Sequence, residues 1–168
     1  LLGLLRLRLI TERFFPEAKW QFEVYIASFR FPDMIFELLV LGALSAAFIP
    51  VFSEYLEKNK EEAYRIASST INLVSLFFGL AAIVLFLFAP QFSRLIAPTY
   101  GPVKIEMLTN LTRIMLLAEI LFCISSFMTG IIQSSQRFLI PALAPIIYNL
   151  GIIFGVVVLT PVWVIYGA

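Results

Sequence analysis

The sequence predicts an all-α membrane protein, a multi-span helical bundle of about five transmembrane helices. Hydrophobic residues make up 61% of the 168 residues and charged residues 14%, against roughly 45–50% and about 25% in soluble globular domains. Two long stretches, Ile66 to Ser93 and Phe138 to Ala168, carry no charge at all. We therefore expect residues 1–168 to form a single transmembrane helical domain.

The first predicted span covers residues 1–15 and carries three arginines. Arg6 and Arg13 share one helix face, whereas Arg8 lies on the other side with Glu12 one turn along. Arg8 therefore has a local partner for its charge, and Arg6 has none. Snorkelling of the side chains to a membrane interface is the alternative for all three arginines.

The second predicted span, residues 22–53, begins with a charged stripe. Glu23, Arg30 and Glu37 recur at intervals of seven residues and share one helix face. Because ionisable groups at membrane depth are costly and are functional candidates by default, this stripe should face a cavity. A local ion pair between Arg30 and Asp33 is the alternative.

Pro32, Gly42 and Pro50 punctuate the same span. Proline and glycine are tolerated in transmembrane helices where neighbouring helices re-satisfy the freed backbone groups. We expect these three residues to be the hinges of the span.

A polar amphipathic linker, residues 54–65, separates this span from the remaining ones. Its sequence places Glu54 before Lys58 and Glu61 before Arg65 in the favourable i,i+4 order, so we expect a solvated helix at one membrane face. The remaining spans are predicted at 66–97, 104–135 and 138–160.

Arg113 and Glu119 lie inside the fourth predicted span. Six residues apart, they occupy different helix faces and cannot form a local pair. Each must find a partner on another helix, reach a wet cavity or snorkel to the interface.

The composition leaves few enzyme classes open. With no histidine and one cysteine, Cys123, the chain has neither a Cys/His metal site nor histidine acid/base chemistry. The motifs of zinc proteases, serine hydrolases and P-loop proteins are absent from the sequence, and a net charge of +1 gives no basic surface for nucleic acid. We predict a protein that is not an enzyme and needs no metal or cofactor.

Three ordered motifs resemble the lipid II flippase family (MurJ, also called MviN). They are LGLLRLRL at Leu2 to Leu9, RFPDMIFELLVLGALSAAFIPVFSEYLEK at Arg30 to Lys58, and QRFLIPALAPIIYNLGII at Gln136 to Ile153. They are similar, respectively, to the family's first-helix arginine motif, its second-helix signature and the junction between its fourth and fifth helices. The chain also begins without methionine, inside an apolar segment, so we expect a fragment of a longer protein.

The resemblance implies a part of the N-terminal lobe of a larger, multi-pass transporter in the bacterial inner (cytoplasmic) membrane. Its partners would be lipid II (the undecaprenyl-pyrophosphate-linked precursor of peptidoglycan), membrane lipids and the remaining helices of the transporter. It implies a cytoplasmic position for the 54–65 linker. Alternatives are an exporter of another polyprenyl-linked glycan or of a small cation, and a membrane-embedded polyprenyl-phosphate transferase.

The resemblance also implies the substrate-binding residues. Arg6 matches the family's cavity arginine, Arg30 stands where a basic residue is common, and Glu23 stands where an aspartate is usual. We expect Arg6 and Arg30 to bind the pyrophosphate in a shared aqueous cavity, with Glu23 tuning or gating that site. The sequence departs from the family pattern at Leu7, which replaces an acid, and at Phe36, where some members carry another arginine.

Overall fold

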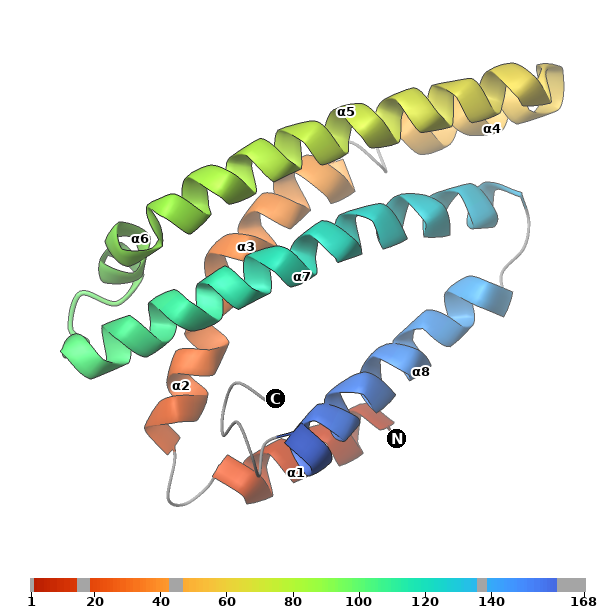
Figure 1. The fold of residues 1–168 in the computed structure, drawn as a ribbon. Coiled ribbons are helices and arrows are strands. Elements are labelled where there is room, and N and C mark those ends of the chain that lie inside the picture. The colour runs from red at the N-terminus through yellow and green to blue at the C-terminus, as the bar shows by residue number, and fades with distance from the viewer. Residues whose placement is uncertain (1, 15–18, 43–46, 136–138, 160–168) are drawn as a thin grey trace.

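The computed structural model describes residues 2–14, 19–42, 47–135 and 139–159, and throughout these ranges the regular elements are helices (Figure 1). In chain order they are α1 (Leu2–Phe14), α2 (Lys19–Ser28), α3 (Arg30–Phe36), the π-helical η1 (Glu37–Leu41), α4 (Ile49–Lys58), α5 (Lys60–Leu87), α6 (Ala89–Ile96), α7 (Pro102–Ser134), α8 (Leu139–Phe154) and the π-helical η3 (Gly155–Leu159).

The predicted all-α membrane class is confirmed. Within the described ranges, three helical stretches are long and apolar enough to cross a membrane, namely Lys60–Leu87, Pro102–Ser134 and Leu139–Leu159. The predicted limits of the five spans stay predictions. Positions 15 and 160, at the ends of the first and the last predicted span, lie outside the described residues. The start of the third family motif, at 136–138, also lies outside them.

The bundle is built around α7, which contacts α2, α3, α4, α5, α6 and α8. The long helices α5 and α7 lie side by side, α4 folds back along α5, and α1 pairs with α8 on the other side of α7 (Figure 1). One buried cluster joins α4, α5 and α7 through Phe52, Phe78 and Phe127, and a second joins α2 to α7 through Val24 and Leu108. Because α7 contributes to both clusters, it fixes the relative position of the other helices.

The predicted second span is divided into short segments. The helix is interrupted at Phe29 between α2 and α3, three residues before Pro32, which has no backbone N–H to donate to the carbonyl of Ser28. Regular bonding resumes when the Asp33 N–H donates to the Phe29 carbonyl at 2.8 Å. A proline inside an apolar helix thus produces a break rather than a straight rod.

The third predicted span also changes direction before its end. Helix α5 stops at Leu87, Phe88 takes φ −94° and ψ 13°, and α6 starts anew with Pro90 in its first turn. Proline is well tolerated there because the first N–H groups of a helix have no intrahelical acceptor. The short α6 packs on the first turns of α7 and buries Ala89 and Ser93 against it.

The predicted polar linker consists of two helix ends that meet at Asn59. The Asn59 Oδ1 atom accepts hydrogen bonds from the N–H groups of Glu61 at 3.1 Å and Glu62 at 3.3 Å, which caps the start of α5. The predicted ion pair between Lys58 and Glu54 is present at 2.6 Å and lowers the pKa of the Glu54 carboxyl. An exposed ion pair of this kind adds little stability, so the cap by Asn59 contributes more to the stability of the turn between α4 and α5.

Replacing Asn59 by alanine should lower the free energy of unfolding by about 1 kcal/mol, because two N–H groups of α5 lose their acceptor. Asn59→Asp should be nearly neutral, since aspartate caps equally well. Equilibrium denaturation of the full-length protein in detergent micelles measures both values. Equal losses in the two variants would show that the cap does not stabilise this corner.

Candidate functional site

Arg6 lies on α1 and faces α8. Its Cζ atom is 5.9 Å from the centre of the Tyr148 ring, in cation–π range, and the side chain is half-buried. It also interacts electrostatically with Tyr25, which is buried on α2. Arg8 pairs instead with Glu12 at 2.7 Å on the exposed face. The predicted contrast between a locally paired Arg8 and an Arg6 without a local acid is confirmed by these contacts.

Arg30 lies at the start of α3 and is exposed. Within the described part of the chain it forms no ion pair, and the predicted alternative of a local pair with Asp33 is not formed. Asp33 turns instead toward α7. The guanidinium of Arg30 is therefore available to a ligand.

Glu119 and Asp33 are joined across two helices. Glu119 is 7% exposed near the middle of α7, and a side-chain hydrogen bond links its carboxyl group to that of Asp33 on α3. Because ionised carboxylates only accept hydrogen bonds, one member of the pair must carry a proton for the bond to form. Of the three alternatives for Glu119 given by the sequence, a partner on another helix is therefore the one that the structure supports.

Tyr148 connects the arginine to the acids. Besides Arg6, the carboxyl groups of Asp33 and Glu119 lie close enough to Tyr148 for their charges to act on its hydroxyl group. We call Arg6, Tyr148, Asp33 and Glu119 the polar cluster; it draws one residue each from α1, α8, α3 and α7. Glu119 is buried and Arg6 half-buried, whereas Asp33 and Tyr148 are exposed. Ionisable groups gathered from four apolar helices are typical of a substrate or ion pathway.

Sequence reasoning had named Glu119 as needing a partner, but it had placed neither Asp33 nor Tyr148 in a site. The signal for Glu119 in the sequence is an acidic residue within an otherwise apolar helix. Its partner could not be read from the sequence, because Asp33 and Tyr148 lie on helices far from it along the chain.

Glu23 occupies a different place from the polar cluster. Its Oε2 atom lies 3.9 Å from the Nζ atom of Lys104, so it links α2 to the start of α7. Lys104 also lies over the ring of Tyr100, 5.1 Å from its centre. Among the described contacts of Arg6, Arg30 and Glu23, none joins one of these predicted site residues to another. Their common cavity thus stays a prediction.

The three predicted hinges lie at or near irregular backbone. Pro32 is buried and follows the break at Phe29, Gly42 ends the π-helical η1, and Pro50 is in the first turn of α4. Residues 43–46, which separate the last two, lie outside the described residues. π-Helical stretches are frequent at functional sites, and the hinge role of the three residues stays a prediction.

The comparisons with known proteins agree on one family. The family model described as "Lipid II flippase MurJ" matches residues 18–168. The chain is 34% identical over 135 residues to a probable lipid II flippase MurJ of Buchnera aphidicola subsp. Acyrthosiphon pisum, covering 79% of this chain and 26% of the relative. It is 30% identical over 159 residues to a probable lipid II flippase MurJ of Rhizobium tropici, covering 84% and 29%.

A third relative, the lipid II flippase MurJ of Thermosipho africanus, is 32% identical over 162 residues, covering 92% of this chain and 32% of the relative. The chain thus spans between a quarter and a third of the length of these three relatives. No solved structure gives a significant match. The family model covers most of the chain, and the chain therefore belongs to the lipid II flippase MurJ family.

Proposed function

We propose that the chain is a part of a lipid II flippase that helps to bind the pyrophosphate of its substrate during transport across the membrane. The observation that carries this proposal is the polar cluster, in which a half-buried Arg6 packs against Tyr148 and two acids on α3 and α7 lie near the same tyrosine. The family match supports the substrate class, because the matched relatives are named as lipid II flippases.

The chemistry of the substrate suits the residues present. Lipid II carries an anionic pyrophosphate that must cross an apolar layer, and a guanidinium stays charged there and holds phosphate oxygens in a planar fork. Arg6 would supply such a fork from α1, held in place by the ring of Tyr148. Arg30 would supply a second from α3, where it is exposed and free of ion pairs among the described residues.

The acids would balance and gate these cations. Glu23 bridges α2 and α7 through Lys104, so loss of this 3.9 Å pair would free the start of α7 to move relative to α2. Motion about the irregular backbone at Phe29 and at Glu37–Leu41 would then expose the site alternately to the two sides of the membrane.

The bacterial inner membrane is where this chain resides, and three apolar helices fit that location. An exporter of another polyprenyl-linked glycan would use the same guanidiniums and stays the alternative within transport. A polyprenyl-phosphate transferase would need acids grouped to hold magnesium. The described residues contain no group of three or more metal-binding side chains, and Glu23 and Asp33 are engaged separately with Lys104 and Glu119.

The test is transport by the full-length protein reconstituted into liposomes with fluorescently labelled lipid II. We expect the label to move between the leaflets in the presence of EDTA, with the substrate chemically unchanged on extraction. Liposomes of the same composition without protein give the background rate. Transport that stops with EDTA, or a substrate recovered with its pyrophosphate cleaved, would favour a transferase instead.

A further inference from the structure

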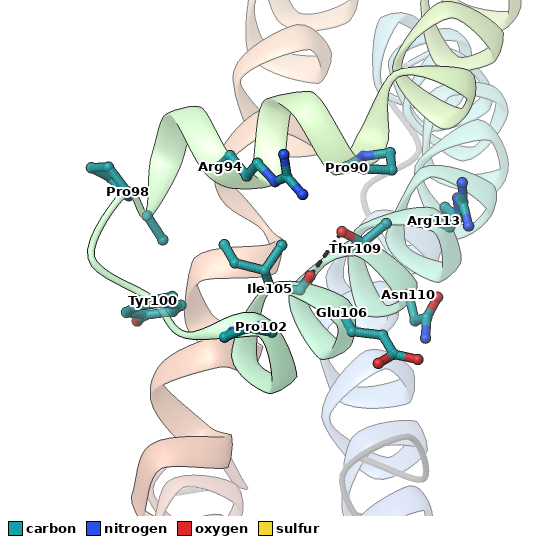
Figure 2. Close-up of a pocket in the computed structure, with 11 residues that line it drawn as sticks. Pro90, Arg94, Pro98, Tyr100, Pro102, Ile105, Glu106, Thr109, Asn110 and Arg113 are labelled. Atoms are coloured by element: carbon teal, nitrogen blue, oxygen red, sulfur yellow. Dashed lines mark hydrogen bonds between the residues drawn. The ribbon is translucent and has the colours of Figure 1, made fainter.

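A second polar site lies at the end of the bundle where α6 turns into α7. A cavity of about 750 Å³ opens there between α6, the turn at 97–101 and the first turns of α7. Two guanidiniums from different helices line it: Arg94 from α6 and Arg113 from α7 (Figure 2). The transport mechanism uses neither of them.

Both guanidiniums have hydrogen-bonding capacity to spare. The Arg113 Nε atom donates to the carbonyl of Phe86 at 3.2 Å, and its Cζ atom lies 5.1 Å from the centre of the Phe86 ring. That single bond uses one of five N–H groups and holds the side chain at the cavity. Arg94 is exposed, has no ion pair within the described ranges, and points from α6 toward α7 (Figure 2).

The charge of the cavity lining identifies the class of ligand. Glu106 and Asn110 complete the polar side of the cavity, so two arginines and one carboxylate leave a net charge of one positive unit. A phosphodiester carries one negative charge and matches this lining. A pyrophosphate carries more negative charge than this lining balances.

The surroundings of the cavity are apolar and exposed. Leu95 and Val103 are 72% and 69% exposed and lie on α6 and on the first turn of α7, and Leu87 and Phe88, 64% and 50% exposed, lie where α5 ends before α6. The cavity walls add the rings of Pro98 and Pro102 together with other apolar side chains. A ligand that joins an anionic head to hydrocarbon tails fits both the guanidiniums and this apolar rim.

The base of the cavity is held rigidly. The Thr109 Oγ1 atom lies 3.0 Å from the Oγ atom of Ser93, which ties α7 to α6, and it also hydrogen-bonds the Ile105 carbonyl at 2.8 Å (Figure 2). Both side chains are buried. The site is therefore formed before any ligand arrives, as ligand sites usually are.

A second cavity at the opposite end of α7 provides a contrast. It measures about 510 Å³ and is lined by residues of α4 and by residues 133–135. Among the described residues its lining contains no arginine or lysine, and the one charged side chain there is Glu57. The lining of the α6–α7 cavity is therefore the better match for an anionic head.

We propose that the α6–α7 cavity binds the phosphodiester head group of an anionic phospholipid, with Arg94 and Arg113 as its phosphate ligands. The lipid would fasten the α6–α7 end of the bundle to the surface of one leaflet. This inference is independent of the transported substrate, because neither arginine belongs to the polar cluster.

The experiment measures lipid binding to the full-length, delipidated protein by native mass spectrometry. Phosphatidylglycerol and phosphatidylcholine with the same acyl chains are added in turn. We expect phosphatidylglycerol to bind more tightly than phosphatidylcholine. Arg94→Gln and Arg113→Gln should each weaken phosphatidylglycerol binding about fivefold, since a basic group near an anionic lipid contributes about 1 kcal/mol, which corresponds to that factor. Phosphatidylcholine binding should change little. Equal binding of the two lipids would overturn the proposal.

Two further variants separate a binding role from a structural one. Glu106→Gln should tighten phosphatidylglycerol binding by removing the one negative charge of the lining. Arg65→Gln, at the exposed far end of α5, is the matched control and should leave it unchanged. If Arg94→Gln weakens phosphatidylglycerol binding no more than Arg65→Gln does, the site is wrong. A structural effect of Arg94→Gln is not expected, because Arg94 makes no hydrogen bond or ion pair among the described residues.

Competition with undecaprenyl pyrophosphate distinguishes the two possible sources of the phosphate. An equimolar amount should leave phosphatidylglycerol bound. If the pyrophosphate displaces it and then loses affinity in Arg94→Gln, the cavity belongs to the transported substrate and the assignment to phospholipid is wrong.

Discussion

Replacing Arg6 by alanine should abolish lipid II transport by the full-length protein, and Arg6→Lys should already reduce it by about ten- to hundredfold. Lysine keeps the charge but loses the planar fork, and losing one charge-assisted hydrogen bond costs about 1.5–3 kcal/mol. The half-buried position of Arg6 against Tyr148 restricts how far a lysine ammonium could adjust. Initial rates of lipid II flipping in proteoliposomes provide the measurement.

The matched control for this substitution lies two residues further along the same helix. Arg8 is exposed and pairs with Glu12, so Arg8→Lys and Arg8→Ala should transport at nearly the wild-type rate. Membrane insertion and expression must be equal in all four variants. If Arg6→Lys is as active as the wild type, Arg6 merely snorkels and does not bind the pyrophosphate.

Arg30→Lys should show a smaller loss than Arg6→Lys, because Arg30 is exposed and no protein contact among the described residues fixes its geometry. A loss that exceeds the effect at Arg6 would place the main phosphate contact on α3 instead. Full activity of both lysine variants would remove the guanidinium sites from the transport mechanism altogether.

Local sequence rules predicted the features that depend on neighbours along the chain. The Arg8–Glu12 and Glu54–Lys58 pairs follow from i,i+4 spacing and are formed at 2.7 Å and 2.6 Å. The irregular course of the second span follows from Pro32. These features need only the geometry of one helix, which is why the sequence was sufficient.

Features that depend on contacts between helices were beyond the sequence. The sequence left a partner on another helix, a wet cavity or snorkelling open for Arg113 and Glu119. In the structure Arg113 donates to the carbonyl of Phe86 on α5, and Glu119 pairs with the carboxyl of Asp33 on α3. An apolar helix surface can face lipid or any neighbouring helix, because lipid tails and helix side chains are about equally apolar, so the sequence does not predict which helices are in contact. The π-helical stretch Glu37–Leu41 also has no local signal beyond the glycine that follows it.

Replacing Glu119 by alanine should lower the free energy of unfolding by about 1–3 kcal/mol, because the Asp33 carboxyl loses its partner and α7 loses buried volume. Glu119→Gln should cost much less. Its amide can donate permanently to the Asp33 carboxylate, whereas the native pair needs a shared proton. Denaturant unfolding of the full-length protein in mixed micelles measures both variants.

A double-mutant cycle with Asp33→Ala isolates the interaction from the effects of each substitution alone. We expect a coupling free energy between Asp33 and Glu119 of about 0.6–1.7 kcal/mol, the range found for hydrogen bonds between transmembrane helices. Glu106→Ala is the control, since Glu106 is exposed on the same helix, and it should not couple to Asp33. Strict additivity of Asp33→Ala and Glu119→Ala would show that the two carboxyl groups do not stabilise the contact between α3 and α7. The polar cluster would then be held together by its apolar surroundings alone.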